Sequence, residues 1–170
     1  EAIYQCAPYI GYPKTLNAAA TAAEVLASAG VDLPLPEAAT VAYEDRAAAG
    51  RAIQEPLYGD EVEQVFSALP EPFNRVVPQL LTAGAFGEFE TRGGLDVAMR
   101  ELISLVAIAA LGVAAQMRPH VAGAIRAGNS RQKVAAALVQ VLPYIGGPYA
   151  LSGLVLVATY DENDSSEAYR

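Results

Sequence analysis

The sequence contains only one cysteine, Cys6, and one histidine, His120, among 170 residues. One cysteine cannot form a disulfide or a dithiol redox pair within the chain. One cysteine and one histidine cannot build a thiolate or imidazole cage, so we predict no metal site. Basic residues are also scarce, because 11 Lys and Arg stand against 19 Asp and Glu, a formal net charge of −8. This balance argues against nucleic-acid binding and against docking on an anionic membrane surface.

Targeting and membrane-spanning signals are missing as well. No basic segment precedes an apolar stretch near Glu1, so the sequence shows no signal peptide. Positions 134–160 carry no charge, which raises the question of a membrane span. Pro143, Pro148 and two glycines interrupt this run and predict two helices of about 13 residues, each too short to cross a bilayer. We expect both helices to lie in the core or a subunit interface of a cytoplasmic homo-oligomer.

Helical spacing of apolar residues recurs along the chain, whereas the sustained alternation that marks strands is missing. We therefore predict an all-α antiparallel bundle, and 170 residues are enough to bury a hydrophobic core. Proline starts, N-cap residues and glycine stops predict helices over about 13–28, 37–51, 61–69, 72–83, 97–111, 115–127 and 131–142, with another after 148. The glycine- and aromatic-rich stretch 84–94 is expected to be a loop.

A short repeat relates the two ends of the chain. Positions 5–16 and 140–151 are identical at seven of twelve residues, at an offset of 135. Each copy predicts a helix, a Pro-Tyr-Ile-Gly turn and a second helix that begins near a proline, as in pseudo-symmetric halves of one core. The alternative is that this tetrapeptide is only a convenient turn. By the same offset, Glu1 aligns with Ala136 inside a helix, so the first copy lacks its upstream half. Either further residues precede Glu1 in the mature protein, or the first copy serves only as a packing partner.

His120 and Glu101 are the main candidates for chemistry, on two helices that Gly112 allows to fold back on each other. At a rise of about 1.5 Å per residue, Glu101 lies three to four turns before the bend and His120 about two turns after it. The two side chains meet only if loop geometry and side-chain reach close that difference. A carboxylate that orients an imidazole makes an acid–base couple near neutral pH. The alternative is a histidine satisfied in the core and a glutamate that offsets a helix dipole.

A series of short motifs follows one another from Tyr43 to Tyr160: Leu57-Tyr58-Gly59-Asp60, Phe86-Gly87-Glu88, Arg92-Gly93-Gly94-Leu95-Asp96, Arg100-Glu101-Leu102-Ile103-Ser104-Leu105, Ala109-Ala110-Leu111-Gly112, His120, Ala124-Ile125, Gly128, Gln140 and Pro143-Tyr144-Ile145-Gly146-Gly147-Pro148. Together these motifs resemble the carboxymuconolactone decarboxylase family and cover about two-thirds of the chain in order. Residues 1–28 resemble the second half of another such module, as in tandem members of the family.

The resemblance implies an all-α fold of the alkylhydroperoxidase D-like type that assembles as a homo-trimer or hexamer, with active sites near subunit interfaces. It also divides the chain into three parts. Residues 1–36 would form the second half of an incomplete first module, 37–160 a complete module, and 161–170 a polar tail.

The resemblance implies one of two chemistries. The alkylhydroperoxidase branch uses Glu, Cys-x-x-Cys and His, but Val113 and Gln116 stand at the two cysteine positions here. A peroxidase would need Cys6 from a neighbouring subunit and an external resolving thiol. The decarboxylase branch needs no cysteine and no cofactor, because its lactone substrate takes up the electrons of the departing carboxylate.

For that branch the resemblance suggests His120 and Glu101 as catalytic residues of a cofactor-independent lyase that acts on a small anionic lactone acid. Arg92, Arg100 and Tyr144 are the candidates for substrate binding, with Arg92 as a bidentate carboxylate clamp. The two arginines can instead be structural ion pairs. A non-catalytic member of the family, with a structural His–Glu pair, is the competing interpretation.

Overall fold

The central helix of the protein is α7 (Val97–Leu111), which forms an antiparallel hairpin with α8 (Ala114–Arg126) in the computed structural model. The structure describes residues 1–161. The Asp96 side chain caps α7 by accepting a hydrogen bond from the backbone N–H of Met99 at 2.7 Å. This cap and the bend at Gly112 confirm the helical hairpin predicted from the sequence.

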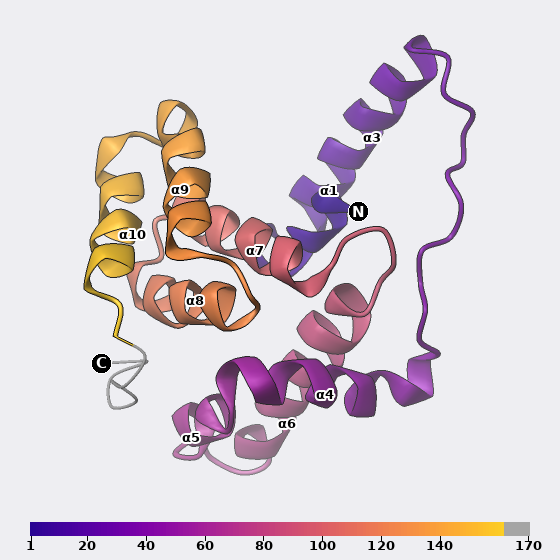
Figure 1. Ribbon diagram of the computed structural model, residues 1–170. Coiled ribbons are helices and arrows are strands. Elements are labelled where there is room, and N and C mark those ends of the chain that lie inside the picture. The colour runs from indigo at the N-terminus through magenta and orange to yellow at the C-terminus, as the bar shows by residue number, and fades with distance from the viewer. Residues whose placement is uncertain (162–170) are drawn as a thin grey trace.

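Helices form the whole architecture, and no strand occurs within residues 1–161. Figure 1 shows α8, α9 and α10 grouped around one end of α7, while α4, α5 and α6 form a second group below it. Helix α3 projects away, and an extended segment returns from its end to α4. The remaining elements are α1 (Ala2–Gln5), α2 (Ala7–Ile10), α3 (Tyr12–Ser28), the 3₁₀ turn η1 (Tyr43–Asp45), α4 (Arg46–Tyr58), α5 (Glu61–Phe66), α6 (Phe73–Leu80), the π-helix η2 (Leu81–Glu90), α9 (Arg131–Ile145) and α10 (Gly147–Thr159).

Two hydrophobic clusters hold these groups together. The larger cluster joins α7, α8, α9 and α10, and Leu105, Ala109 and Leu138 in it are completely buried. The smaller cluster joins α4 to η2 through Leu57, Tyr58 and Phe86. Buried apolar area of this kind supplies most of the driving force for folding. Helices α1 and α2 pack on α7, so the N-terminal segment is part of the same core.

The two copies of the repeat adopt the same turn. Gly11 (φ 80°, ψ 157°) separates α2 from α3, and Gly146 (φ 86°, ψ 155°) separates α9 from α10. Glycine is required at both sites because residues with a Cβ rarely adopt such a positive φ. The break in the apolar run therefore falls at Gly146, since Pro143 lies inside α9. That residues 1–36 and 37–160 belong to separate modules stays a prediction, and the proposed tail 161–170 lies beyond the described residues except for Asp161.

Two expected boundaries were wrong. Positions 37–42 are not helical, because this segment pairs with the loop before α7: the Gly93 N–H donates to the Ala38 carbonyl at 2.8 Å, and the Thr40 hydroxyl donates to the Thr91 carbonyl at 2.5 Å. The stretch 84–94 is not a simple loop, since most of it continues the π-helix η2 to Glu90. Its buried backbone groups need partners, which a helix supplies.

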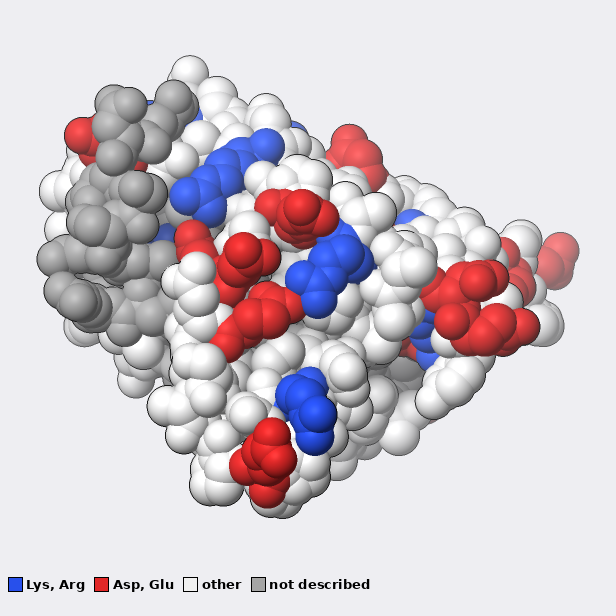
Figure 2. All heavy atoms as spheres, turned by 90° about the horizontal axis from the view of Figure 1, so that it is seen from below, with Lys and Arg blue, Asp and Glu red and all other residues white. Residues whose placement is uncertain are grey.

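Two further features of the fold are the length of its helices and the distribution of charge on its surface. Among residues 1–161, no helix combines the length and apolar character needed to cross a bilayer. Basic and acidic side chains are interspersed on the face drawn in Figure 2. Three arginine–glutamate ion pairs lie outside the N-terminal cluster of charges: Arg46–Glu88, Arg51–Glu63 and Arg126–Glu61.

Candidate active site

The hairpin of α7 and α8 brings Glu101 and His120 together. The Nδ1 atom of His120 lies 3.9 Å from Oε2 of Glu101. Glu101 is 1% exposed, and the His120 side chain is 13% exposed. The pair is therefore buried on the carboxyl side and open on the imidazole side.

Tyr58, the last residue of α4, connects the two groups. Its hydroxyl donates a hydrogen bond to Oε2 of Glu101 at 2.6 Å and lies 3.1 Å from Nδ1 of His120. No functional role was predicted for Tyr58 from the sequence, although it belongs to the Leu57-Tyr58-Gly59-Asp60 motif. The three residues form a continuous hydrogen-bonded chain from a buried carboxyl group to an imidazole ring.

Gly123 of α8 leaves the space in which the three side chains meet. A Cβ at this position would lie 2.2 Å from the Tyr58 hydroxyl and 2.9 Å from Oε2 of Glu101. Both distances are shorter than van der Waals contact. The close approach of α8 to α4 and α7 therefore depends on glycine at position 123.

Burial changes the acid–base properties of the pair. Desolvation raises the pKa of Glu101 to about 7, although the hydrogen bond from Tyr58 opposes this shift. Desolvation also lowers the pKa of His120 to about 4. Near pH 7 the imidazole is neutral and Glu101 is divided between its acid and carboxylate forms. Glu101 and His120 are therefore linked by hydrogen bonds through Tyr58, and they do not form a permanent ion pair.

A cavity of about 300 Å³ lies next to this chain of residues. Its apolar wall comes from side chains of α2, α5, η2 and α7 and from Val113. Glu101 does not line the cavity and reaches it only through Tyr58 and His120. No lysine or arginine lines this cavity among the described residues. Its polar lining consists of Tyr9, Tyr58, Glu90, Gln116 and His120.

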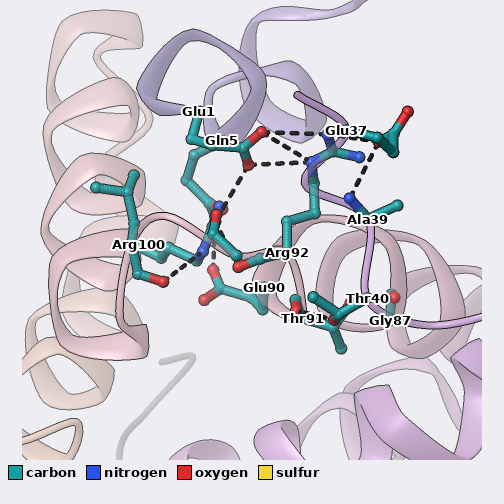
Figure 3. Close-up of polar contacts among 12 residues, drawn as sticks. Glu1, Gln5, Glu37, Ala39, Thr40, Gly87, Glu90, Thr91, Arg92 and Arg100 are labelled. Atoms are coloured by element: carbon teal, nitrogen blue, oxygen red, sulfur yellow. Dashed lines mark hydrogen bonds and ion pairs between the residues drawn. The ribbon is translucent and has the colours of Figure 1, made fainter. Parts of the chain in front are cut away.

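Arg92 and Arg100, expected to bind substrate, lie outside the cavity lining. Figure 3 shows both arginines gathered around Glu1. Arg92 Nε lies 3.0 Å from Oε2 of Glu1, and Arg92 Nη2 lies 3.4 Å from Oε1 of Glu37. Arg100 is completely buried and donates to Glu1 at 3.2 Å and to the side-chain oxygen of Gln5 at 3.0 Å. This geometry is that of the structural ion pairs named as the alternative.

Tyr144 and Cys6 also lie apart from His120. Tyr144 is 82% exposed on α9 and does not line the cavity. Cys6 borders a different, apolar groove beside α7 and α9, and burial raises the pKa of its thiol. Val113 and Gln116, at the positions where the peroxidase branch has cysteines, do line the His120 cavity. Within residues 1–161, no three metal-ligating side chains lie together.

Comparison with known proteins identifies one similarity. Residues 76–159 match the model of the carboxymuconolactone decarboxylase family. A search of curated proteins found no match. The matched segment contains Glu90, Glu101 and His120, whereas Gln5, Tyr9 and Tyr58 lie before it.

Proposed function

Through residues 76–159 the chain belongs to the carboxymuconolactone decarboxylase family, and from this premise we propose that it is a cofactor-independent carboxy-lyase. The proposed substrate is a small carboxylated lactone or a related acid. The observation that carries the proposal is the hydroxyl of Tyr58, which bridges Glu101 and His120 at the wall of a largely apolar cavity. This arrangement can deliver a proton to a bound molecule at neutral pH.

The route of the proton follows from the hydrogen bonds. When Glu101 is protonated, it donates to the Tyr58 oxygen, Tyr58 donates to Nδ1 of His120, and the ring carries its proton on Nε2. Loss of the Nε2 proton to the substrate is balanced by two shifts, from Tyr58 to Nδ1 and from Glu101 to Tyr58. Glu101 is left as the carboxylate, which accepts the hydrogen bond from Tyr58. Whether Nε2 can donate a proton therefore depends on the protonation of Glu101, whose pKa is about 7.

The proposed reaction has two steps. The bond between the lactone γ-carbon and its carboxylate breaks, carbon dioxide leaves, and the electron pair enters the conjugated lactone carbonyl to give a dienolate. His120 Nε2 then returns one proton to carbon. Nε2 next takes up a proton from solvent, and the two shifts reverse, from Nδ1 to Tyr58 and from Tyr58 to Glu101, which restores the acid form of Glu101. One carboxylate is exchanged for one C–H bond, and no oxidant or reductant is consumed.

The apolar cavity supports this reaction even though no arginine lines it. A carboxylate removed from water is costly to hold, and its charge spreads over the conjugated dienolate when carbon dioxide leaves. Apolar walls such as Phe86, Ile108 and Leu111 therefore favour the step that disperses the charge. Protonated Glu101 does not repel the bound anion in the way that a carboxylate would.

His120→Ala tests the proposal directly. The variant should lower the turnover of 4-carboxymuconolactone by about 100-fold or more, because it removes the group that donates the proton. Turnover is followed by release of carbon dioxide, and circular dichroism verifies the fold. Arg118→Ala, on the same helix but outside the cavity lining, is the matched control and should keep wild-type turnover. Wild-type protein without turnover of carboxylated lactones, or an unaffected His120→Ala, would discard the lyase in favour of a structural His–Glu pair.

We also propose that the protein is a homo-oligomer, as the family resemblance implies. Exposed apolar side chains on α10 support this proposal, since Leu151 is 55% and Val155 60% exposed. Apolar surface of this kind is typical of contacts between subunits.

A further inference from the structure

Glu90 is a second buried acid beside the cavity, and the proton route described above does not use it. It is the last residue of the π-helix η2, is 5% exposed and lines the same cavity as His120. A glutamate in such a place is uncommon, because an ionised carboxylate needs either water or a paired cation.

Gln5 fixes the orientation of the Glu90 carboxyl group. Arg100 has only donors, so it determines that the amide oxygen of Gln5 faces the guanidinium, at 3.0 Å from Nη1. The amide nitrogen of Gln5 therefore faces the other way and donates to Oε1 of Glu90 at 2.5 Å and to Ser104 at 3.1 Å. Figure 3 shows Gln5 between Arg100 and Glu90. Oε2 of Glu90 is buried and has no hydrogen-bond partner among the described residues.

The surrounding charges favour the neutral acid form of Glu90. Arg100 is the nearby cation, but Glu1 already pairs with it. Glu101 on α7 adds negative charge, and Tyr9 and Tyr58 contribute only neutral hydroxyl groups.

Burial, followed by the charge of Glu101, raises the pKa of Glu90 to about 8. His120, the remaining titratable group of the lining, is neutral in this range because its pKa is lowered to about 4. Because Oε1 of Glu90 accepts from Gln5, the proton of the acid belongs on Oε2.

We propose that Glu90 is a ligand-binding and specificity-determining residue, whose Oε2–H donates a hydrogen bond to a carbonyl or carboxylate oxygen of the molecule in the His120 cavity. Gln5 acts through Glu90 as a positioning residue. The inference rests on the proposed function, since it concerns the same cavity and selects oxygen-acceptor substrates such as lactones. A neutral carboxylic acid that donates to a developing oxyanion is an established way to stabilise an enolate.

Two matched probes test this hydrogen bond without requiring turnover. The first, 2(5H)-furanone, has a lactone carbonyl, whereas 2,5-dihydrofuran has a similar ring without it. Ligand-detected NMR gives the dissociation constant of each probe from pH 6.5 to 9. Wild-type protein should bind the furanone about tenfold more tightly than dihydrofuran at pH 6.5, the worth of a buried hydrogen bond. Furanone affinity should fall about tenfold by pH 9, because only the protonated fraction of Glu90 binds it.

Three variants locate the effect at Glu90. Glu90→Gln keeps an N–H donor without a titrating proton, so its furanone binding should lose the pH dependence that titration of Glu90 causes. Glu90→Leu should bind both probes equally. Glu88→Gln, two residues earlier on the same π-helix and outside the cavity lining, should behave as wild type. Because Glu101 titrates in all of these proteins, the difference between wild type and Glu90→Gln isolates Glu90.

The inference is overturned if wild-type protein binds both probes equally or binds neither. It is also overturned if Glu90→Gln loses affinity with pH as wild type does. This failure is distinguishable from failure of the lyase. Turnover that depends on His120, combined with a cavity that does not distinguish the probes, would reject only the role of Glu90. Probe binding that depends on Glu90, without turnover of any carboxylated lactone, would reject only the lyase.

Discussion

The hydroxyl of Tyr58 joins the side chains of Glu101 and His120 into one hydrogen-bonded chain. Its hydrogen bonds span 43 positions to Glu101 and 62 positions to His120. Removing this oxygen would leave a buried carboxyl group without its donor and would interrupt the only hydrogen-bonded route among the described residues between Glu101 and the ring.

Tyr58→Phe is the corresponding variant. We expect turnover to fall by about 100-fold, as for loss of an acid–base residue. We expect the free energy of unfolding to fall by about 1–2 kcal/mol, because Glu101 is left unsatisfied. Turnover and urea denaturation measure the two effects. Tyr144→Phe, at a tyrosine that is 82% exposed, should change neither. A Tyr58→Phe variant with normal turnover would show that the proton takes another path.

Sequence reasoning reached part of this site. The predicted hairpin allowed Glu101 to meet His120 but did not require it, because the two residues lie at different distances from the bend. Tyr58 was not foreseeable as their bridge, since its contacts depend on how α4 crosses α7 and α8. Arg92 and Arg100 were expected to bind substrate because of the family resemblance and because a guanidinium group can pair with a carboxylate. The sequence does not reveal that Glu1, which is about 90 positions earlier in the chain, forms ion pairs with both arginines.

The crossing of α4 and η2 depends on two glycines, at positions 50 and 87. A Cβ on Gly50 would lie 2.1 Å from the Thr82 carbonyl oxygen and 2.7 Å from the Gly87 nitrogen, and a Cβ on Gly87 would lie 2.1 Å from the Arg46 carbonyl oxygen. These atoms are backbone and cannot move aside as a side chain can. The crossing places Phe86 and Glu90 at the cavity wall.

Gly50→Ala should therefore destabilise the protein by about 2–3 kcal/mol, as overpacking of a close contact does. Gly84→Ala, within η2, is the control, because an added Cβ there meets no atom within 4 Å. Alanine at that helical site should be neutral or slightly stabilising. Urea denaturation compares the two variants. Equal stability of both would mean that the helices do not pack as closely at Gly50 as described.

The glycines of η2 explain the error in the predicted loop. Gly84 and Gly87 suggested a chain break from sequence alone, since glycine is usually a helix breaker. In the structure both lie inside η2, and Gly87 permits close contact with α4. The helices of the α7–α8 hairpin were predictable because their signals are local. The segment 37–42 was not, because its contacts are with the loop at 91–93.

At the scale of the whole molecule, the buried acids link stability to pH. Glu101 and Glu90 have pKa values of about 7 and 8 in the folded protein, above the usual value of a glutamate. The folded state therefore binds more protons than the unfolded chain, and stability falls as pH rises through these values. His120 has a lowered pKa of about 4, so its contribution rises with pH up to about 6.5 and then levels off.

The free energy of unfolding should therefore decrease by about 2 kcal/mol between pH 6.5 and pH 8. Urea denaturation at the two pH values measures the change. Glu90→Gln should remove more than half of it, because Glu90 titrates later than Glu101. Glu88→Gln should leave the decrease intact. Stability that stays constant or increases over this interval would contradict the assignment of two neutral acids to the core.

The N-terminal turns α1 and α2 contribute Gln5, Pro8 and Tyr9 to the surroundings of the cavity, and α4 contributes Tyr58. All four residues precede the segment that carries the family signature. The segment that matches the family model is therefore shorter than the stretch of chain that builds the cavity. A shortened variant that lacks residues 1–10 would therefore lose part of the cavity wall and the side chain that orients Glu90.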